Sequence, residues 1–343
     1  MADSSYRRVY RQPQVSLVRR TSVRMRLVSA AAFLAIIQSA LSDSFASLEV
    51  AAGALAGALI TEYAANRLLK TGFTLKDGSA AASALILTLL LPNHVSPVLA
   101  ALGGAFAMGI VKHSFGGLGA NWLNPALGGW LFVRASWPDA FSPARMSMAA
   151  GDRLPLFLEH FGRLVRAFLN RSFFPLFGAE LPGDFPPVFF SSGAGIIADR
   201  GILALLLGTI LLAAFEVSRS WIPALFLVIY VLLIRMAGDL SLGFWNGDIL
   251  SALSSGGTLV AAFILLVDPA TGAKSSAGAA AGTALAAFFS FVFRYAGGET
   301  LGAVFAVVLM NILFPLIRIL ENRWFYLGAG ERDGEAAEAG RIS

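Results

Sequence analysis

The chain carries ten apolar segments separated by short polar turns, and this succession restricts the folds that it can adopt. The segments lie near residues 27–42, 45–62, 79–92, 97–111, 122–134, 201–215, 221–236, 249–267, 276–293 and 299–317. Hydrophobic residues make up 57% of the 343 and charged residues 14%, which is typical of helical proteins that cross a bilayer many times. Several segments are shorter than the ~20 residues of a full crossing. The sequence predicts an all-α integral membrane protein with about ten transmembrane or half-spanning helices.

The segments divide the chain into five regions. We expect a basic cytoplasmic tail over 1–26, a first five-segment membrane half over 27–134, an extracytoplasmic loop over 135–200, a second five-segment half over 201–320 and a cytoplasmic tail over 321–343. Within the loop, residues 153–170 alternate apolar and charged positions at a helical period, which indicates a helix lying in the membrane interface. Lys and Arg concentrate in the short loops that this topology places inside. Both termini are therefore expected on the cytoplasmic side.

Matching landmarks recur in the two membrane halves. A Gly turn opens an apolar run that ends at Leu91-Pro92 in the first half and at Asp268-Pro269 in the second. A small-residue helix and a Gly pair follow in each. Because each half has an odd number of segments, the halves would be inverted relative to each other, and broken helices meet near the midplane in such folds. We predict broken or re-entrant helices at the third, fifth and eighth segments; chance similarity among Gly- and Ala-rich helices is the alternative.

The most informative break is the run Phe115-Gly116-Gly117-Leu118-Gly119, followed by Asn124-Pro125. An unpaired backbone group in hydrocarbon costs several kcal/mol, so irregular main chain persists there only when it is buried in protein or lines a cavity. The consecutive amides of a Gly turn, here and at Gly256-Gly257, can hold a phosphate or an anionic ring. Close helix packing explains such glycines equally well.

Six acidic residues of the membrane halves lie at segment ends, so the sequence shows no proton relay. They are Glu62, Asp77, Glu216, Asp239, Asp268 and Glu299. Asp77 precedes Gly78, and Asp268 precedes Pro269. Either aspartate could bind a cation or the polar edge of a cofactor, or could cap the next turn.

Several classes of function are excluded by composition. The absence of cysteine rules out thiolate-ligated iron–sulfur clusters, Cys-ligated zinc and disulfides. The three histidines fall in separate loops, which favours solvated or interfacial side chains over a haem or metal site. The net charge of +5 is dispersed over loops and tails, so it reflects membrane topology rather than nucleic-acid binding. Any electron carrier held by this chain must be organic.

The order of the motifs resembles the RnfD/NqrB family, the membrane subunits of the ion-translocating Rnf complex and of the sodium-pumping NADH:quinone reductase. The resemblance is strongest to RnfD and rests on Thr74-Leu75-Lys76-Asp77-Gly78-Ser79, Leu89-Leu90-Leu91-Pro92, Lys112 leading into Phe115–Gly119, Asn124-Pro125-Ala126, Ser255-Gly256-Gly257, Asp268-Pro269-Ala270-Thr271 and Leu309-Met310-Asn311. It implies one subunit of a complex that passes electrons between ferredoxin and NAD and couples this transfer to movement of Na⁺ or H⁺. Such a subunit is not catalytic alone, and its partners are the other subunits and membrane lipid.

The resemblance also implies FMN, which the family joins through its phosphate to a threonine in a Ser-x-Ala-Thr type motif after the fifth segment. Residues 135–200 contain no threonine here, and the nearest counterpart is Ser142-Pro143-Ala144-Arg145. An arginine cannot form a phosphoester. Three possibilities remain: FMN held without a covalent link, a serine such as Ser142 or Ser147 as acceptor, or a subunit that has lost this flavin.

The breaks and the resemblance together nominate one set of residues for a cofactor or ion region. These are Asp77, Gly78, Lys112, Gly116, Gly117, Gly119, Asn124, Gly256, Gly257 and Asp268. Two other functional classes stay open at this point. One is a stand-alone channel or transporter for a small solute, since inverted repeats with broken helices are common there. The other is a flavin-free scaffold subunit of the same complex.

Overall fold

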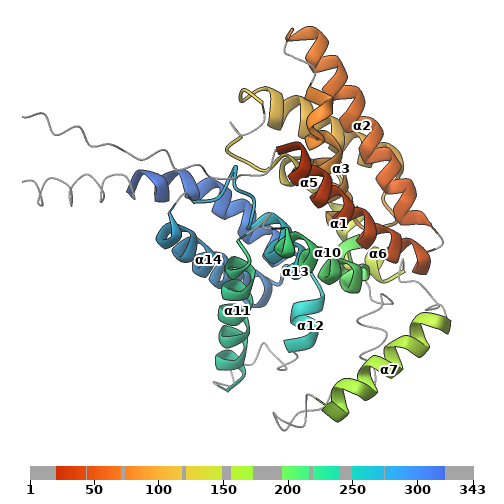
Figure 1. Ribbon diagram of the computed structural model, residues 1–343, viewed down its shortest axis with the longest axis vertical. Coiled ribbons are helices and arrows are strands. Elements are labelled where there is room, and N and C mark those ends of the chain that lie inside the picture. Colours follow the sequence, from red (N-terminus) through yellow and green to blue (C-terminus); the bar gives the residue numbers. More distant parts are fainter. Residues whose placement is uncertain are drawn as a thin grey trace, which may run out of the picture.

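The computed structural model describes residues 21–43, 45–70, 74–117, 121–148, 156–172, 195–215, 219–239, 249–273 and 275–320. All regular elements in these ranges are helical, so the predicted all-α class is confirmed (Figure 1). The first half comprises α1 (Thr21–Ser42), α2 (Ala46–Leu68), the 3₁₀ turn η1 (Thr74–Asp77), α3 (Ser79–Leu90), α4 (Pro97–Phe106) with its π-helical extension η2 (Ala107–His113), and α5 (Pro125–Ser136).

The second half is also a succession of helices. It comprises α9 (Ile197–Arg200), α10 (Ile202–Ala214), α11 (Trp221–Asp239), α12 (Ile249–Ser254), α13 (Thr258–Val260) with the π-helical η5 (Ala261–Leu265), α14 (Ser276–Phe291) with the π-helical η6 (Val292–Ala296), and a last helix, Gly302–Leu320. Between the halves lie η3 (Pro138–Phe141), α6 (Pro143–Met148) and α7 (Leu156–Ser172), the last in place of the helix predicted over 153–170.

Helix lengths agree with a multi-pass membrane protein that contains half-spanning elements. Among the described residues, four helices are long and apolar enough to cross a bilayer, namely α1, α2, α14 with η6, and the last helix. The predicted third and fifth segments are α3 and α5, each only 12 residues long, or about 18 Å. The predicted eighth segment is broken between α12 and α13. Short helices thus occur at all three segments for which breaks were predicted.

Two predicted boundaries differ from the structure. Residues 21–26, expected in the tail, already belong to α1; the remaining tail residues fall outside the described ranges. Residues 196–200, expected in the extracytoplasmic loop, are buried, and the amide of Ile197 donates to the carbonyl of Leu91 at 2.9 Å. The second half therefore begins with α9, which packs against the end of α3, because this backbone contact draws it into the bundle.

Small residues bring the helices of each half into close contact. A Cβ atom at Gly57 of α2 would lie 1.9 Å from the carbonyl oxygen of Ala101 in α4, and one at Gly104 of α4 would lie 2.4 Å from the carbonyl oxygen of Ala54. The two backbones can approach this closely only because these positions lack side chains. In the second half, α11 packs against α14, as α2 packs against α4 in the first half.

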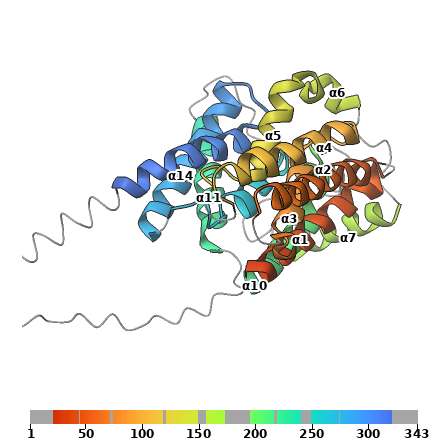
Figure 2. The same cartoon turned by 90° about the horizontal axis from the view of Figure 1, so that it is seen from above.

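The two halves join along α5 and the last helix, which run antiparallel. Asn124 lies opposite Asn311, Trp130 lies opposite Phe305 with ring centroids 4.9 Å apart, and Arg134 lies opposite Glu299. As residue numbers rise along α5 they fall along its partner, as an inverted repeat requires. Figure 2 shows α5 between α2 and α4 on one side and α11 and α14 on the other. A second contact between the halves joins α1 to α10.

The close approach of α2 and α4 makes the fold sensitive to a single methyl group. Gly57→Ala should destabilise the purified chain by about 3 kcal/mol or more, because the obstructing atom is backbone rather than a movable side chain. Ala56→Leu, a larger change at an exposed neighbouring position of α2, should have little effect. Thermal unfolding in detergent measures both; equal transition midpoints for Gly57→Ala and the unmodified chain would contradict this packing.

Candidate functional site

The first break lies at the start of α3. Gly78 adopts a left-handed conformation with φ 77°, and Asp77 Oδ1 accepts a hydrogen bond from the amide of Ser79 at 2.7 Å. Asp77 therefore caps the turn that opens α3, which is one of the two roles that the sequence left open for it.

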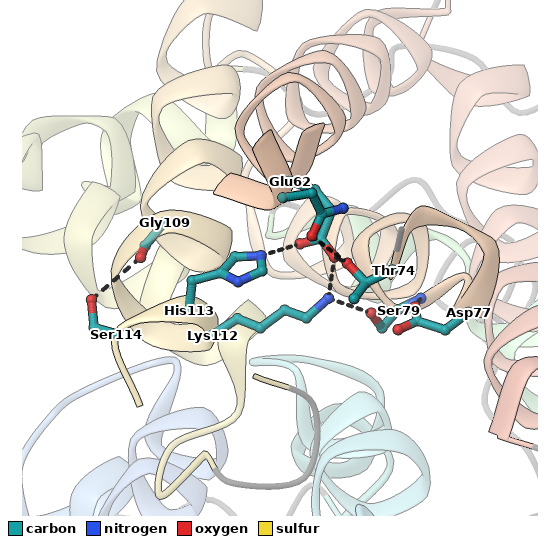
Figure 3. A network of polar contacts seen from close by, with 9 residues as sticks. Glu62, Thr74, Asp77, Ser79, Gly109, Lys112, His113 and Ser114 are labelled. Carbon is teal, nitrogen blue, oxygen red and sulfur yellow. Dashed lines mark hydrogen bonds and ion pairs between the residues drawn. The ribbon is translucent and has the colours of Figure 1, made fainter. Parts of the chain in front are cut away.

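A buried carboxylate, Glu62 of α2, lies beside this break (Figure 3). Lys112 donates from Nζ to Glu62 Oε1 at 2.6 Å, and His113 Nε2 lies 2.7 Å from Glu62 Oε2. Thr74 also donates its hydroxyl to Glu62. The Glu62 side chain is 0% exposed, that of Lys112 is 2% and that of His113 is 7%. A second Lys112 hydrogen bond, 2.7 Å to Ser79 Oγ, links the group to the first residue of α3.

The Glu62 cluster corrects two sequence-based interpretations. Glu62 was expected at a segment end, but it lies inside α2 and is fully buried. His113 was expected to be solvated or interfacial, but it ends the π-helical η2, and its side chain is 7% exposed and contacts Glu62. Lys112, nominated for a cofactor or ion region, donates from its ammonium group to Glu62 and Ser79. The one pointer in the sequence was the Lys112-His113 pair directly after an apolar segment, two nitrogen-bearing side chains without an adjacent acid.

The Gly-rich turn after η2 directs its amides back to its own chain. The amide of Gly117 donates to the carbonyl of Lys112 at 3.0 Å, and that of Gly116 to the carbonyl of His113 at 3.4 Å. A Cβ at Gly117 would meet no atom within 4 Å. Phe115 and Trp122 lie on either side of this turn in the sequence and contact each other edge-to-face, with ring centroids 5.9 Å apart. Gly119 lies outside the described residues.

The second break lies between α12 and α13. Its two glycine amides form an anion-binding cradle that a carboxylate of the same chain occupies. Gly256 and Gly257 both have positive φ, 68° and 69°, so their amides point to one side. Asp199 of α9 accepts from both, at 3.0 Å and 2.9 Å. Arg294 of η6 donates to the carbonyl and the hydroxyl of Ser255 at 3.1 Å and 2.6 Å. The anion that these glycines hold is thus a carboxylate from elsewhere in the chain, which the sequence did not reveal.

The two breaks share one arrangement despite their different residues. In each half a π-helical extension carries a cation back to a serine at the break. Lys112 contacts Ser79 at the start of α3, and Arg294 contacts Ser255 in the turn between α12 and α13. A buried carboxylate accompanies each break, Glu62 in the first half and Asp199 in the second.

The halves meet in a polar junction formed by Asn124, Asp268 and Asn311. Asn124 donates from Nδ2 to Asp268 Oδ2 at 2.8 Å, and its backbone amide donates to Asn311 Oδ1 at 3.0 Å. Asn124 Oδ1 caps α5 by accepting from Ala126, and Asp268 Oδ1 accepts from the amide of Ala270. Asn124 and Asp268, nominated separately from sequence, are therefore in direct contact, and Asn311 joins them.

The flavin-attachment candidates lie on α6 or directly before it. Ser142 Oγ accepts from the amide of Arg145, so its hydroxyl caps this helix, and Arg145 is exposed. Ser147 lies on α6, in a part where side chains are not described. No group of His, Asp and Glu side chains able to hold a metal ion occurs among the described residues.

Comparison with known proteins identifies the family. A family model described as the NQR2, RnfD, RnfE family matches residues 8–325. The chain belongs to this family.

Relatives within the family are D-type subunits of ion-translocating complexes. One belongs to the proton-translocating ferredoxin:NAD(+) oxidoreductase complex of Clostridium ljungdahlii and is 28% identical, over 79% of this chain and 81% of that protein. Its counterpart in the Na(+)-translocating ferredoxin:NAD(+) oxidoreductase complex of Acetobacterium woodii is 27% identical, over 82% of each. The counterpart in the ion-translocating oxidoreductase complex of Pseudomonas paraeruginosa is 31% identical, over 78% of this chain and 79% of that protein. The resemblance to RnfD seen in the sequence is thus confirmed.

The buried pair of Glu62 and Lys112 predicts a specific stability pattern for this family member. Lys112→Met should destabilise the chain by about 3–5 kcal/mol, since it leaves a buried carboxylate without its ammonium partner. Glu62→Gln combined with Lys112→Met should recover most of that loss, because both charges are then absent.

Denaturant unfolding of the detergent-purified chain measures these effects. Lys76→Met, at an exposed position of η1, is the matched control and should change stability by no more than ~0.5 kcal/mol. A double variant as unstable as Lys112→Met would contradict the pairing.

Proposed function

We propose that this chain is the D-type membrane subunit of an Rnf-type complex in the bacterial inner membrane. In this role it helps to couple electron transfer between ferredoxin and NAD to translocation of Na⁺ or H⁺. The family match over residues 8–325 and the names of the relatives support this assignment. The other subunits of the complex are its partners, and the chain is not catalytic alone. The positive-inside distribution of Lys and Arg supports cytoplasmic termini.

The observation that carries the proposal is the junction of Asn124, Asp268 and Asn311. Asn124 comes from the first half and the other two residues from the second, so the junction spans the contact between inverted halves. Ion sites of inverted-repeat membrane proteins are built at this place, from the ends of broken helices. Carboxylate and amide oxygens suit a hard cation, and a carboxylate can also carry a proton. Asp268 is the only ionisable member of the three.

Asp268→Leu should reduce coupled ion uptake at least tenfold, because it removes both the charge and the acceptor for Asn124. Asp268→Asn keeps an acceptor and should preserve assembly while it impairs ion movement. The measurement is ferredoxin:NAD oxidoreductase activity and ion uptake by the complex in proteoliposomes, with Asp139→Leu, at an exposed position of η3, as control. Normal uptake with Asp268→Leu would refute the role of the junction. Passage of a small solute through the chain alone would instead favour a stand-alone transporter.

We further propose that this chain holds FMN without a covalent bond. Bound FMN would supply one- and two-electron redox chemistry. The cradle at Gly256 and Gly257 already holds Asp199, so the phosphate does not fit there. The side of the turn at Gly117 offers a better fit. Phe115 and Trp122 are 47% and 43% exposed there, and the buried Asn121 Oδ1 accepts no hydrogen bond from the described residues. Aromatic faces would hold the ring, and Asn121 would accept from a ring N–H.

The mode of flavin binding can be read from the mass of the denatured chain. We expect the unmodified mass of the 343-residue polypeptide, with FMN released into the supernatant, because residues 135–200 contain no threonine to form the phosphoester. Intact-mass spectrometry and flavin fluorescence of the acid supernatant measure the two products. An FMN increment that survives denaturation and disappears in Ser142→Ala or Ser147→Ala would establish serine attachment. Absence of flavin from both fractions would support the scaffold alternative.

A further inference from the structure

Helix α7 presents apolar side chains although it is not a membrane-spanning helix. It has 17 residues, a length of about 25 Å, and it carries three arginines and one glutamate. It is absent from the helices apolar enough to cross a bilayer. Figure 1 shows it apart from the helical bundle. Its surface therefore needs an explanation other than membrane crossing.

The exposed apolar residues of α7 form one stripe. Phe161, Leu164 and Phe168 follow the spacing of neighbouring residues on one helix face, and they are 41%, 69% and 66% exposed. In a soluble environment, three large apolar side chains on one face would form an unfavourable patch. In the interface of a bilayer the same stripe would contact acyl chains.

The positive charges of α7 indicate which kind of membrane surface the helix would bind. At 100° per residue, Arg163 and Arg166 lie on the face opposite Phe161, and Arg171 lies in the last turn. With Glu159 the helix carries a net charge of about two positive units. Helices with an apolar face and an arginine-bearing polar face bind anionic lipid headgroups while the apolar face enters the acyl boundary.

We propose that α7 lies in the membrane interface and binds an anionic phospholipid surface through Arg163 and Arg166, with Leu164 and Phe168 inserted into the acyl boundary. The topology proposed above places this contact on the outer leaflet. The proposal needs only the multi-pass membrane location of the chain and is independent of electron transfer. It assigns a lipid-binding role to a part of the chain, the long connection between the halves, that the motifs of the family resemblance do not cover.

Because the sequence contains no cysteine, spin labels at single introduced cysteines report the depth of α7 in the full chain. Leu164→Cys and Phe168→Cys test the apolar stripe, and Ala167→Cys, at an exposed position toward the polar face, is the matched control. The labelled chains are placed in vesicles of equal parts phosphatidylcholine and phosphatidylglycerol. Accessibility to oxygen and to a water-soluble nickel chelate is then measured.

Labels at 164 and 168 should be more accessible to oxygen than to nickel, as expected about 5–10 Å into the acyl boundary. The label at 167 should show the reverse. Arg163→Gln with Arg166→Gln should raise nickel accessibility at 164, since each arginine favours the anionic surface by about fivefold. Vesicles of phosphatidylcholine alone should have the same effect.

Three outcomes would overturn the proposal. A label at 164 that is as accessible to nickel as the label at 167 would place α7 in water. Insertion that is unchanged without phosphatidylglycerol and without both arginines would remove the anionic lipid from the interaction. Exclusion of both reagents from position 164 in the assembled complex, but not in the chain alone, would show that another subunit covers the stripe. None of these results depends on whether the complex transfers electrons.

Discussion

Polar groups at a helix break within a membrane must find partners inside the protein, because lipid offers none. This requirement explains the polar contacts of both breaks. At the second break, Asp199 accepts hydrogen bonds from the backbone amides of Gly256 and Gly257. These amides precede α13, so they have no partner within that helix. At the first, Asp77 caps the start of α3 while Lys112 joins Ser79 to the buried carboxylate of Glu62. The buried carboxylate of Glu62 is paired with the ammonium group of Lys112, and that of Asp199 accepts hydrogen bonds from backbone amides.

These contacts also connect the breaks to the rest of the bundle. Lys112 and Glu62 lie on η2 and α2, so the helix pair that glycines bring close together also holds the first break. Asp199 belongs to α9, which packs against the end of α3 in the other half. Satisfying a buried group therefore fixes the relative positions of distant segments. Buried ion pairs of this kind add little net stability, but they are strongly destabilising when half of the pair is removed.

The sequence predicted the helical class, the three short or broken segments and the family. It also nominated Asn124 and Asp268, which the structure places in contact. It could not predict the partners of Glu62 or Asp199. Lys112 is 50 positions from Glu62, and Gly256 is 57 positions from Asp199. The position of a residue along an apolar segment indicates how deeply its side chain is buried. The hydrogen-bond partner of that side chain depends on which helices pack side by side, which the sequence of one segment does not show. His113 was misassigned for the same reason, since its partner lies on α2.

The π-helical extensions that carry Lys112 and Arg294 have a consequence for how such a protein can change over evolution. A wide turn accommodates one residue more than an α-helical turn, and one residue corresponds to a rotation of about 100°. Loss of a single residue within the wide turn of η2 or η6 would restore α-helical winding and leave the cation in nearly the same phase, whereas loss of a residue from the regular part of α4 or α14 would rotate the cation away from its serine by about 100°. These two π-helical turns are therefore the places in α4 and α14 where chain length can change while the contact between cation and serine is kept.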